Sequence, residues 1–516
     1  MVLPYDVCYR SRIAPGAACA DLPADEAKGE RDEVNERDLR DWFASSADVI
    51  IKEYPLSEGD ASNKILLMYC DGMINKDHIE QRVLPNLQNI ISHHREGNMS
   101  TFALPTLLQM HEMTGPDVME TMSVNLYAGF LIIYFEEQQR FFGLDLSNPP
   151  NRSPEESNTE TSIKGPRDGF TESIITNIAL IRKRLLTRSL CCEKMEIGKR
   201  SHTSIALMYI DDVIDSDLLQ DARRRLQEID IDAVISSAQL EELLSGQKYN
   251  FFPLLDYAGR PDYVADSLLR GRFVILCDGS PMALIAPANL MYILKSPEDV
   301  HTPFYYVAFE RVLRLGGLIV ATLLPGFWIS LSAFNIDQIP FSLVATISSS
   351  RLGLPLSGPM DFIIMLLLFE LFREAGARLP KVVGQTVTVV GGLIVGDAAI
   401  RSGITSPTTL VITSISTIAM YTLVNQTLAG IVTILRVIIL LESTVFGIYG
   451  FMVSLIGLVL YMSTLESFGV PYLSPLSPPR FREMITAIFA KPFSSMKSRP
   501  KMLSPKDDTR QSEDPQ

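Results

Sequence analysis

A long apolar region limits the folds open to this chain more than any other feature. Residues 315–465 are dominated by Leu, Ile, Val, Gly, Thr and Ser, whereas the residues up to about Arg314 are rich in charge. A helix that spans a membrane needs about 20 apolar residues, and Leu315–Phe334 alone reaches this length. The chain becomes polar again after Pro479. We therefore predict a membrane protein with a large soluble N-terminal region.

Further apolar stretches follow the first and indicate four to six spans in total. Residues 339–359 are moderately apolar but are interrupted by Ser, Gly and Pro, which favours a re-entrant or interfacial segment there. The last stretch is long enough for two spans. The stretches after Leu315–Phe334 are approximately Met360–Phe372, Val382–Ile400, Thr408–Val424 and Thr427–Leu465.

Basic residues predict the side of the membrane on which each end of the chain lies, because Lys and Arg are enriched in short cytosolic loops. The first residues lack the apolar core of a signal peptide, so we expect the N-terminal region to remain in the cytosol. The C-terminal tail is expected there too, which requires an even number of spans in a multi-pass membrane protein. The basic residues of the tail are Arg480, Arg482, Lys491, Lys497, Arg499 and Lys501.

The soluble region contains an internal repeat. Residues 67–71 (LMYCD) resemble residues 207–211 (LMYID), and a third segment, Val274–Pro281, resembles the first. Each begins as a short apolar run, which is typical of a strand, and a helical pattern follows the first of them. We predict an α/β soluble region of two related subdomains, followed by an α-helical transmembrane domain.

Changes in composition indicate boundaries between these parts. A Pro/Ser/Glu-rich segment connects the two predicted subdomains, and the acidic first segment is expected to be disordered. The predicted parts are a disordered segment (1–39), subdomain 1 (40–148), a linker (149–164), subdomain 2 (165–300), the transmembrane helices (310–467) and a cytosolic basic and polar tail (468–516).

Asp71, Asp211 and Asp278 each follow an apolar strand pattern. Carboxylates at strand ends could line a ligand cleft, as they often do in α/β folds. Asp also caps turns and the helices that follow them. We favour the capping interpretation for all three residues.

Five charged residues interrupt the apolar half within MLLLFELFREAGARLPKVVGQ (365–385). Arg373, Arg378 and Lys381 are expected to mark a cytosolic turn between two spans. Glu370 and Glu374 lie within one helical turn of Arg373 and Arg378, so ion pairs between them form easily. The two carboxylates fit headgroup-level ion pairs, a charged ring at a pore mouth, or a contact to the soluble region.

Three more ionisable residues, Asp397, Arg436 and Glu442, lie deeper in apolar segments. A charge within a span is costly and usually faces protein or water, so we take them as candidates for a pore or for coupling. Asp397 could instead pair with Arg401 near the membrane edge. A Gly-x-x-x-Gly pattern predicts close helix packing at Gly392 and Gly396.

Several functional classes lack support. The sequence has no Walker A loop, HExxH, GxSxG or dinucleotide fingerprint, so no constellation supports catalysis, a cofactor or a metal. The net charge of −14 argues against nucleic acid as a partner, since phosphate binding needs a basic face. The cysteines have no CxxC spacing and are expected to be free thiols in the cytosol.

Four blocks in order give the chain a family resemblance. They are GPRDGFTESIITNIALIRKRL (165–185), RPDYVADSLLRGRFVILCDGSPMALIAP (260–287), LLLFELFREAGARLPKVVGQTVTVVGGLIVGDAAIRSGITSP (366–407) and SFGVPYLSPLSP (467–478). Together they make the chain resemble the GerA family of spore germination proteins, and within it the A-type subunit of a germinant receptor. The likeness covers about residues 40–480, and residues 1–39 match nothing in it.

The resemblance implies a receptor in the inner membrane of a bacterial spore, where the chain contacts membrane lipid. The partners it implies are a B-type transporter-like membrane subunit, a C-type lipoprotein subunit and further copies of this chain. It also implies a nutrient-gated ion channel, but it assigns no individual role to the charges at 370–381. A non-conducting signalling scaffold is the alternative, and a secondary transporter is weaker because the membrane region shows no internal repeat.

Overall fold

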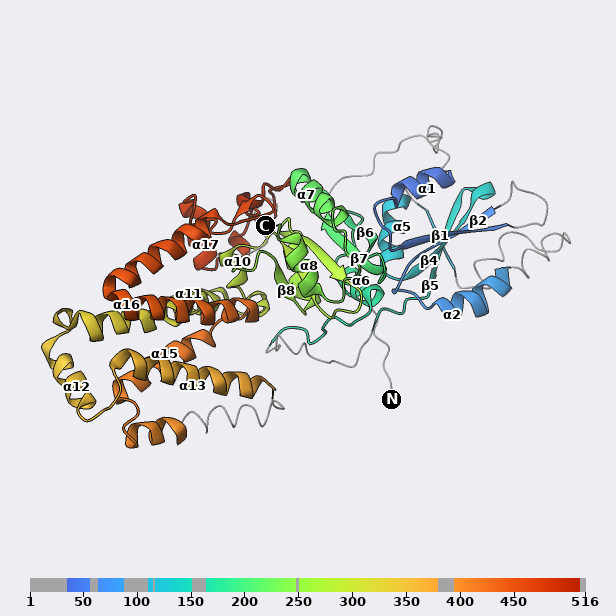
Figure 1. The fold of residues 1–516 in the computed structure, drawn as a ribbon. Helices are drawn as coiled ribbons and strands as arrows, with labels where there is room; N and C mark the ends of the chain where they lie inside the picture. The colour runs from blue at the N-terminus through green and yellow to red at the C-terminus, as the bar shows by residue number, and fades with distance from the viewer. Residues whose placement is uncertain are drawn as a thin grey trace, which may run out of the picture.

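The computed structural model describes residues 35–55, 64–87, 110–114, 117–150, 164–246, 250–378 and 394–510. Two five-stranded sheets lie in series and are followed by a bundle of long helices (Figure 1). All strand pairs within the two sheets are antiparallel. An α/β region therefore precedes a helical part, as the sequence predicted, and each of its two sheets is antiparallel.

Subdomain 1 is a sheet of order β1-β2-β4-β5-β3 that is covered on both faces. Side chains of β4 alternate between two apolar clusters, with Ile133 in one and Ile132 in the other, because successive residues of a strand point to opposite faces. Its strands are β1 (Val49–Pro55), β2 (Lys64–Cys70), β3 (His111–Met113), β4 (Phe130–Phe135) and β5 (Arg140–Asp145). Its helices are α1 (Glu36–Trp42), α2 (Lys76–His78), which continues as a π-helical turn (Ile79–Val83), and α5 (Val118–Tyr127).

Subdomain 2 repeats this strand order as β6-β7-β9-β10-β8. The matching residues 67–71 and 207–211 therefore begin on β2 and β7, the second strands of their sheets, and the third segment begins on β9 beside β7. The strands are β6 (Leu190–Ile197), β7 (Thr203–Ile210), β8 (Asp256–Ala258), β9 (Phe273–Cys277) and β10 (Ala283–Ala286). The helices are α6 (Ile174–Arg182), α7 (Ser216–Gln227), α8 (Ser237–Leu244), α9 (Pro261–Leu269) and α10 (Leu290–Ile293).

A buried ion pair lies in the interface between the two subdomains. Arg182 on α6 donates from Nε and Nη2 to the two carboxylate oxygens of Asp48, at 2.7 and 2.9 Å. The guanidinium also lies 4.2 Å from the centre of the Tyr127 ring. Burial alone would raise the pKa of Asp48, but the Arg182 charge holds it below its usual value. An isolated parallel β-bridge between Ser46 and Cys192 also links the main chains of the two subdomains. The two subdomains are therefore in direct contact.

The bundle begins with α11 (Phe304–Ile329), which ends in a π-helical turn (Ser330–Phe334). Among the described residues, two helical segments are long and apolar enough to cross a membrane, Phe304–Phe334 and Gln426–Thr464. The predicted interfacial segment contains the short helix α12 (Phe341–Arg351). The other helices are α13 (Gly358–Arg378), a helix at 394–401, α15 (Pro407–Met420) and α16 (Gln426–Thr464).

Helix α16 bends sharply at Gly447, whose φ of 60° is left-handed. Beyond this residue Ser454 donates to the Glu442 carboxylate. Residues twelve apart on a straight helix lie about 18 Å from each other, so this contact requires the two halves of α16 to fold back on one another. The sequence indicated that this stretch is long enough for two spans. The bend at Gly447 divides α16 into two helical segments.

The chain after α16 returns to subdomain 2. Ser467 donates to the main-chain oxygen of Leu254 at 2.6 Å, and Leu290 N donates to Tyr472 O at 2.9 Å. Leu465, Phe468 and Tyr472 belong to the same apolar core as the sheet of subdomain 2. Farther on, a short helix, α17 (Phe481–Ile488), lies beside α10 and α11 (Figure 1). The predicted tail is therefore packed against subdomain 2 over much of its length.

Candidate functional site

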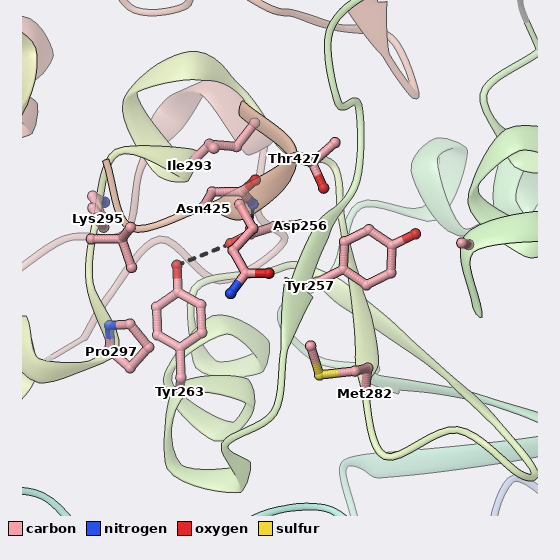
Figure 2. A pocket seen from close by; sticks show the side chains of 12 residues that line it. Asp256, Tyr257, Tyr263, Met282, Ile293, Lys295, Pro297, Asn425 and Thr427 are labelled. Atoms are coloured by element: carbon pink, nitrogen blue, oxygen red, sulfur yellow. Dashed lines mark hydrogen bonds between the residues drawn. The ribbon is translucent and has the colours of Figure 1, made fainter. Parts of the chain in front are cut away.

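The helical part has two polar sites. The first lies where subdomain 2 meets the start of α16. A cavity of about 280 Å³ opens there, lined by β8, α9 and α10 from the soluble side and by residues 424–427 at the start of α16. Figure 2 shows Asp256, Tyr263, Lys295 and Asn425 gathered around it. We call this cavity and its lining the junction pocket.

Asn425 ties the soluble sheet to α16. Its Oδ1 accepts from Leu428 N at 2.9 Å and so caps the helix, while its Nδ2 donates to Asp256 Oδ1 at 2.8 Å. One side-chain amide therefore holds a strand of subdomain 2 and the first turn of a candidate span at the same time. Any rotation of this helix start has to break or stretch the hydrogen bond to Asp256.

Asp256 is a buried carboxyl, 5% exposed, at the start of β8. Burial raises its pKa to about 7, although hydrogen bonds from Asn425 and Tyr263 act in the opposite direction. Figure 2 shows the Tyr263 hydroxyl directed at this carboxyl, at 3.4 Å from Oδ2. The group can therefore change its charge near neutral pH, in contact with the residue that caps α16.

Lys295 lines the same pocket. Burial lowers its pKa well below the usual value for lysine, and neighbouring guanidinium groups, that of Arg270 first, lower it further. The pocket thus holds an acid with a raised pKa and a base with a lowered one. Groups perturbed in this way are candidates for function.

The second polar site is an ion cluster inside the bundle, formed by Glu370, Arg373 and Arg436. Glu370 pairs with Arg373 one turn later on α13, at 2.6 Å, and with Arg436 on α16. Arg436 is fully buried. We call this group the bundle ion cluster; it brings together three of the residues singled out from the sequence and links two helices.

The other predicted charges lie apart from this cluster. Glu374 and Arg378 form an exposed pair at 2.6 Å, and Asp397 and Arg401 form another at 2.8 Å. Glu442 accepts from Ser454 at the bend of α16. The pairings expected within residues 370–378 and 397–401 are therefore present, and Lys381 lies outside the described residues.

Close helix packing occurs at one of the two predicted glycines. A Cβ built on Gly396 would lie 3.3 Å from Leu410 Cδ1, so the helix at 394–401 approaches α15 closely. Gly392 lies outside the described residues.

Of the three carboxylates that follow strands, Asp278 supports the capping interpretation, because its Oδ1 accepts from Ile174 N at the start of α6. Asp71 instead pairs with Lys76, and Asp211 with Lys506.

Sequence reasoning missed Asp256, Asn425 and a further buried carboxylate, Asp361. Asp361 Oδ2 accepts from Thr409 Oγ1 at 2.9 Å, at the start of α15. Asn425 carried a usable signal, because Asn directly before an apolar run is a typical N-cap. Asp361 and Asp256 carried none, since their partners lie far away in the sequence. In the part of the chain that the structure describes, no group of His, Cys, Asp or Glu could hold a metal ion.

Comparison with known proteins places these features in a family. Residues 37–502 match the family described as "Bacillus/Clostridium GerA spore germination protein". The chain is 43% identical to "Spore germination protein XA" of Bacillus anthracis over 485 residues, which cover 93% of this chain and 97% of the relative. It is 33% identical to "Spore germination protein KA" of Bacillus subtilis (strain 168), covering 91% of this chain and 86% of the relative.

Two further comparisons concern the membrane and the soluble region. An "Uncharacterized membrane protein YfkQ" of Bacillus subtilis (strain 168) is 33% identical and covers 88% of both chains. Among solved structures, the N-terminal domain of the A subunit of the Bacillus megaterium spore germinant receptor GerK3 matches with 24% identity and a TM-score of 0.38. That match covers 50% of this chain and 95% of the other.

Proposed function

The chain belongs to the GerA family of spore germination proteins, as an A-type subunit, and from this premise we propose that it forms a nutrient-gated ion path in the spore inner membrane. In this proposal it assembles with a B-type transporter-like membrane subunit, a C-type lipoprotein subunit and further copies of itself. The B-type subunit takes the nutrient, and this chain conducts ions in response.

The observation that carries the proposal is the bundle ion cluster. A buried arginine in a bundle of candidate spans is costly unless it is paired or faces water. Glu370 supplies the partner for Arg436 from a different helix, so a small relative movement of α13 and α16 changes which charges are paired. Such an arrangement supports an ion path that opens when the two helices shift.

The junction pocket supports the same proposal from the soluble side. Asn425 begins the helix that contains Arg436, and its amide is held by Asp256 of subdomain 2. A change in the soluble region can therefore reach the bundle ion cluster along a single helix. We propose this route for the signal from the receptor partners.

The path of the chain supports the proposed orientation. Helix α11 leaves subdomain 2, and the segment after α16 packs against subdomain 2 again. Both flanks of the membrane part therefore lie on one side, which fits an even number of spans with the soluble region and the tail in the cytosol.

The test compares Glu370→Gln with Glu374→Gln in spores that carry the variant gene in place of the normal one. Glu374 lies on the same helix and pairs with an arginine too, but on the exposed surface. We expect Glu370→Gln to change potassium and dipicolinate release after nutrient addition, while the amount of assembled receptor stays normal and Glu374→Gln behaves like the parent. Purified receptor in liposomes should show the same difference in conductance.

The alternative, a non-conducting scaffold, has its own support in the two five-stranded sheets of the soluble region, which a simple pore does not require. A scaffold predicts that liposomes with the assembled receptor conduct no ions, and that Glu370→Gln acts by weakening the binding of partner subunits. Normal nutrient-driven release in Glu370→Gln spores would contradict the ion path through this cluster.

A further inference from the structure

The short helix α17 carries an exposed apolar stripe. Phe481, Ile485 and Phe489 are 69%, 54% and 52% exposed. Residues four apart lie on one face of a helix, and the third of them directly follows the last turn. Large apolar side chains that are exposed in a row, rather than singly, mark a surface that contacts something apolar.

A hydrogen bond to its main chain connects α17 to the bundle. Arg311 on α11 donates to Ala487 O at 3.4 Å, and Arg311 itself pairs with Asp299 at 2.9 Å. The first apolar residue of the predicted span, Leu315, follows Arg311 by one turn, which is about 6 Å along the helix axis. The headgroup layer on each side of a bilayer has about this thickness, 5–7 Å. With the span beginning at Leu315, as the sequence predicts, we expect α17 to lie at headgroup level.

Side chains at the start of α11 and in the segment after α17 have the composition of a membrane interface. Tyr305 and Phe309, in the first turns of α11, are exposed, and Tyr and other aromatic residues are enriched where a protein meets lipid headgroups. Lys491 and Lys497 follow α17, and neither has an acidic partner among the residues that the structure describes. Basic side chains beside an apolar helix face suit anionic lipid.

We propose that α17 is an in-plane membrane anchor, which inserts Phe481, Ile485 and Phe489 into the headgroup layer and holds anionic lipid with Lys491 and Lys497. The ligand is the bilayer surface on the side of the soluble region. Since α17 also contacts α10 and α11, the anchor fixes the distance between subdomain 2 and the membrane plane. The proposal stands without ion conduction, because it rests only on the spans and on the level of α17.

The test places a tryptophan on the stripe of the full-length chain. Phe489→Trp is compared with Val124→Trp, in proteoliposomes that contain anionic lipid brominated either near the headgroup or near the chain end. Val124 is a fitting control because it is 41% exposed on α5 of subdomain 1, away from the bundle. The parent, with two native tryptophans, supplies the baseline.

We expect the tryptophan at 489 to be quenched beyond the baseline, and more by bromine near the headgroup than by bromine near the chain end. The tryptophan at 124 should add no quenching. Adding Lys491→Gln and Lys497→Gln should remove the preference for anionic over zwitterionic lipid. Phe481→Trp repeats the measurement at a second site if Phe489→Trp fails to fold.

Equal quenching at 489 and 124 would overturn the proposal. A blue-shifted emission at 489 without bromine quenching would overturn it as well, because the stripe would then be covered by protein, such as a neighbouring copy or a partner subunit. Neither result depends on whether the receptor conducts ions.

Discussion

Subdomain 2 has two interfaces, one with subdomain 1 and one with the helical bundle, and a buried carboxyl in the first has a lowered pKa whereas a buried carboxyl in the second has a raised one. The first is held by a buried ion pair, Asp48 with Arg182, and by a main-chain bridge. The second combines a continuous apolar core with ion pairs from Asp299 to Arg311 and Arg314 and with hydrogen bonds, among them the one between Asp256 and Asn425. A charge pair with a lowered carboxyl pKa persists at neutral pH, whereas a carboxyl with a pKa of about 7 does not keep one charge state.

The difference indicates that the two interfaces have different roles, although the two sheets have the same strand order. The ion pair between Asp48 and Arg182 stays charged over the whole physiological pH range. Asp256, at the interface with the bundle, changes its charge within that range. Subdomain 1 and subdomain 2 should therefore move as one body, while the bundle moves relative to both.

Replacing Arg182 by Ala should give the largest loss. Removal of one partner from a buried ion pair costs about 3–5 kcal/mol, because the other charge stays buried. Hydrogen exchange of β1 and β6 in the full-length chain should show the loss as faster local opening. Exchange in α16 should change little, and equal acceleration in α16 would mean that the two interfaces are not independent.

A pH series should separate the two interfaces. The folded pKa of Asp256, about 7, is raised above its ordinary value of 3.8, so the folded state holds the proton more tightly. Its stabilising contribution is complete below about pH 4 and is lost as the pH rises to about 7, by about 1.4 kcal/mol per pH unit at most. For Asp48 the folded pKa is lowered, so its contribution is lost only as the pH falls below about 4.

The measurement is hydrogen exchange of residues 421–432, corrected for the intrinsic pH dependence, between pH 5 and 8. Opening should become easier as the pH rises and level off above 7. Asp256→Asn should remove this dependence, because the amide keeps the shape of the side chain and cannot ionise. A slope that survives in Asp256→Asn would assign the titration to another group.

Asn425→Ala should have a smaller effect, about 1–3 kcal/mol, from a lost helix cap and a buried carboxyl that lacks one donor. Asn425→Ser is the matched variant, since serine can cap α16 while its shorter side chain gives up the reach to Asp256. If the hydrogen bond to Asp256 matters, Ser should recover only part of the loss. Full recovery would show that the cap alone is important here.

Lys506→Ala should have the smallest effect. Lys506 pairs with Asp211 at 3.6 Å, and both side chains are exposed, so the pair contributes less than about 1 kcal/mol. Exchange of residues 497–510 should stay close to that of the parent. A large acceleration of exchange there would show that the pair with Asp211 holds the tail against subdomain 2.

The sequence predicted well what depends on neighbours along the chain. Apolar runs at 64–70 and 207–210 are strands, and Glu370 pairs with Arg373 one turn away. The two antiparallel sheets and the partner of Arg436 depend on residues that are far apart, so no local pattern showed them. The bend at Gly447 was also hidden, because a glycine inside an apolar run indicates close helix packing as readily as a change of direction.

The return of residues 465–473 to subdomain 2 has a consequence for how the protein is made. Leu465, Phe468 and Tyr472 fill the same core as β9 and β10, yet the whole membrane part, from Phe304 to Thr464, is synthesised between them. The membrane part is thus an insertion within a soluble fold, and a ribosome that has finished β10 has not finished subdomain 2. Domains generally fold as units during synthesis, in order from the N-terminus. Here the core of the second soluble unit can be completed only after residues 465–473 have been synthesised, and therefore after the whole membrane part has left the ribosome.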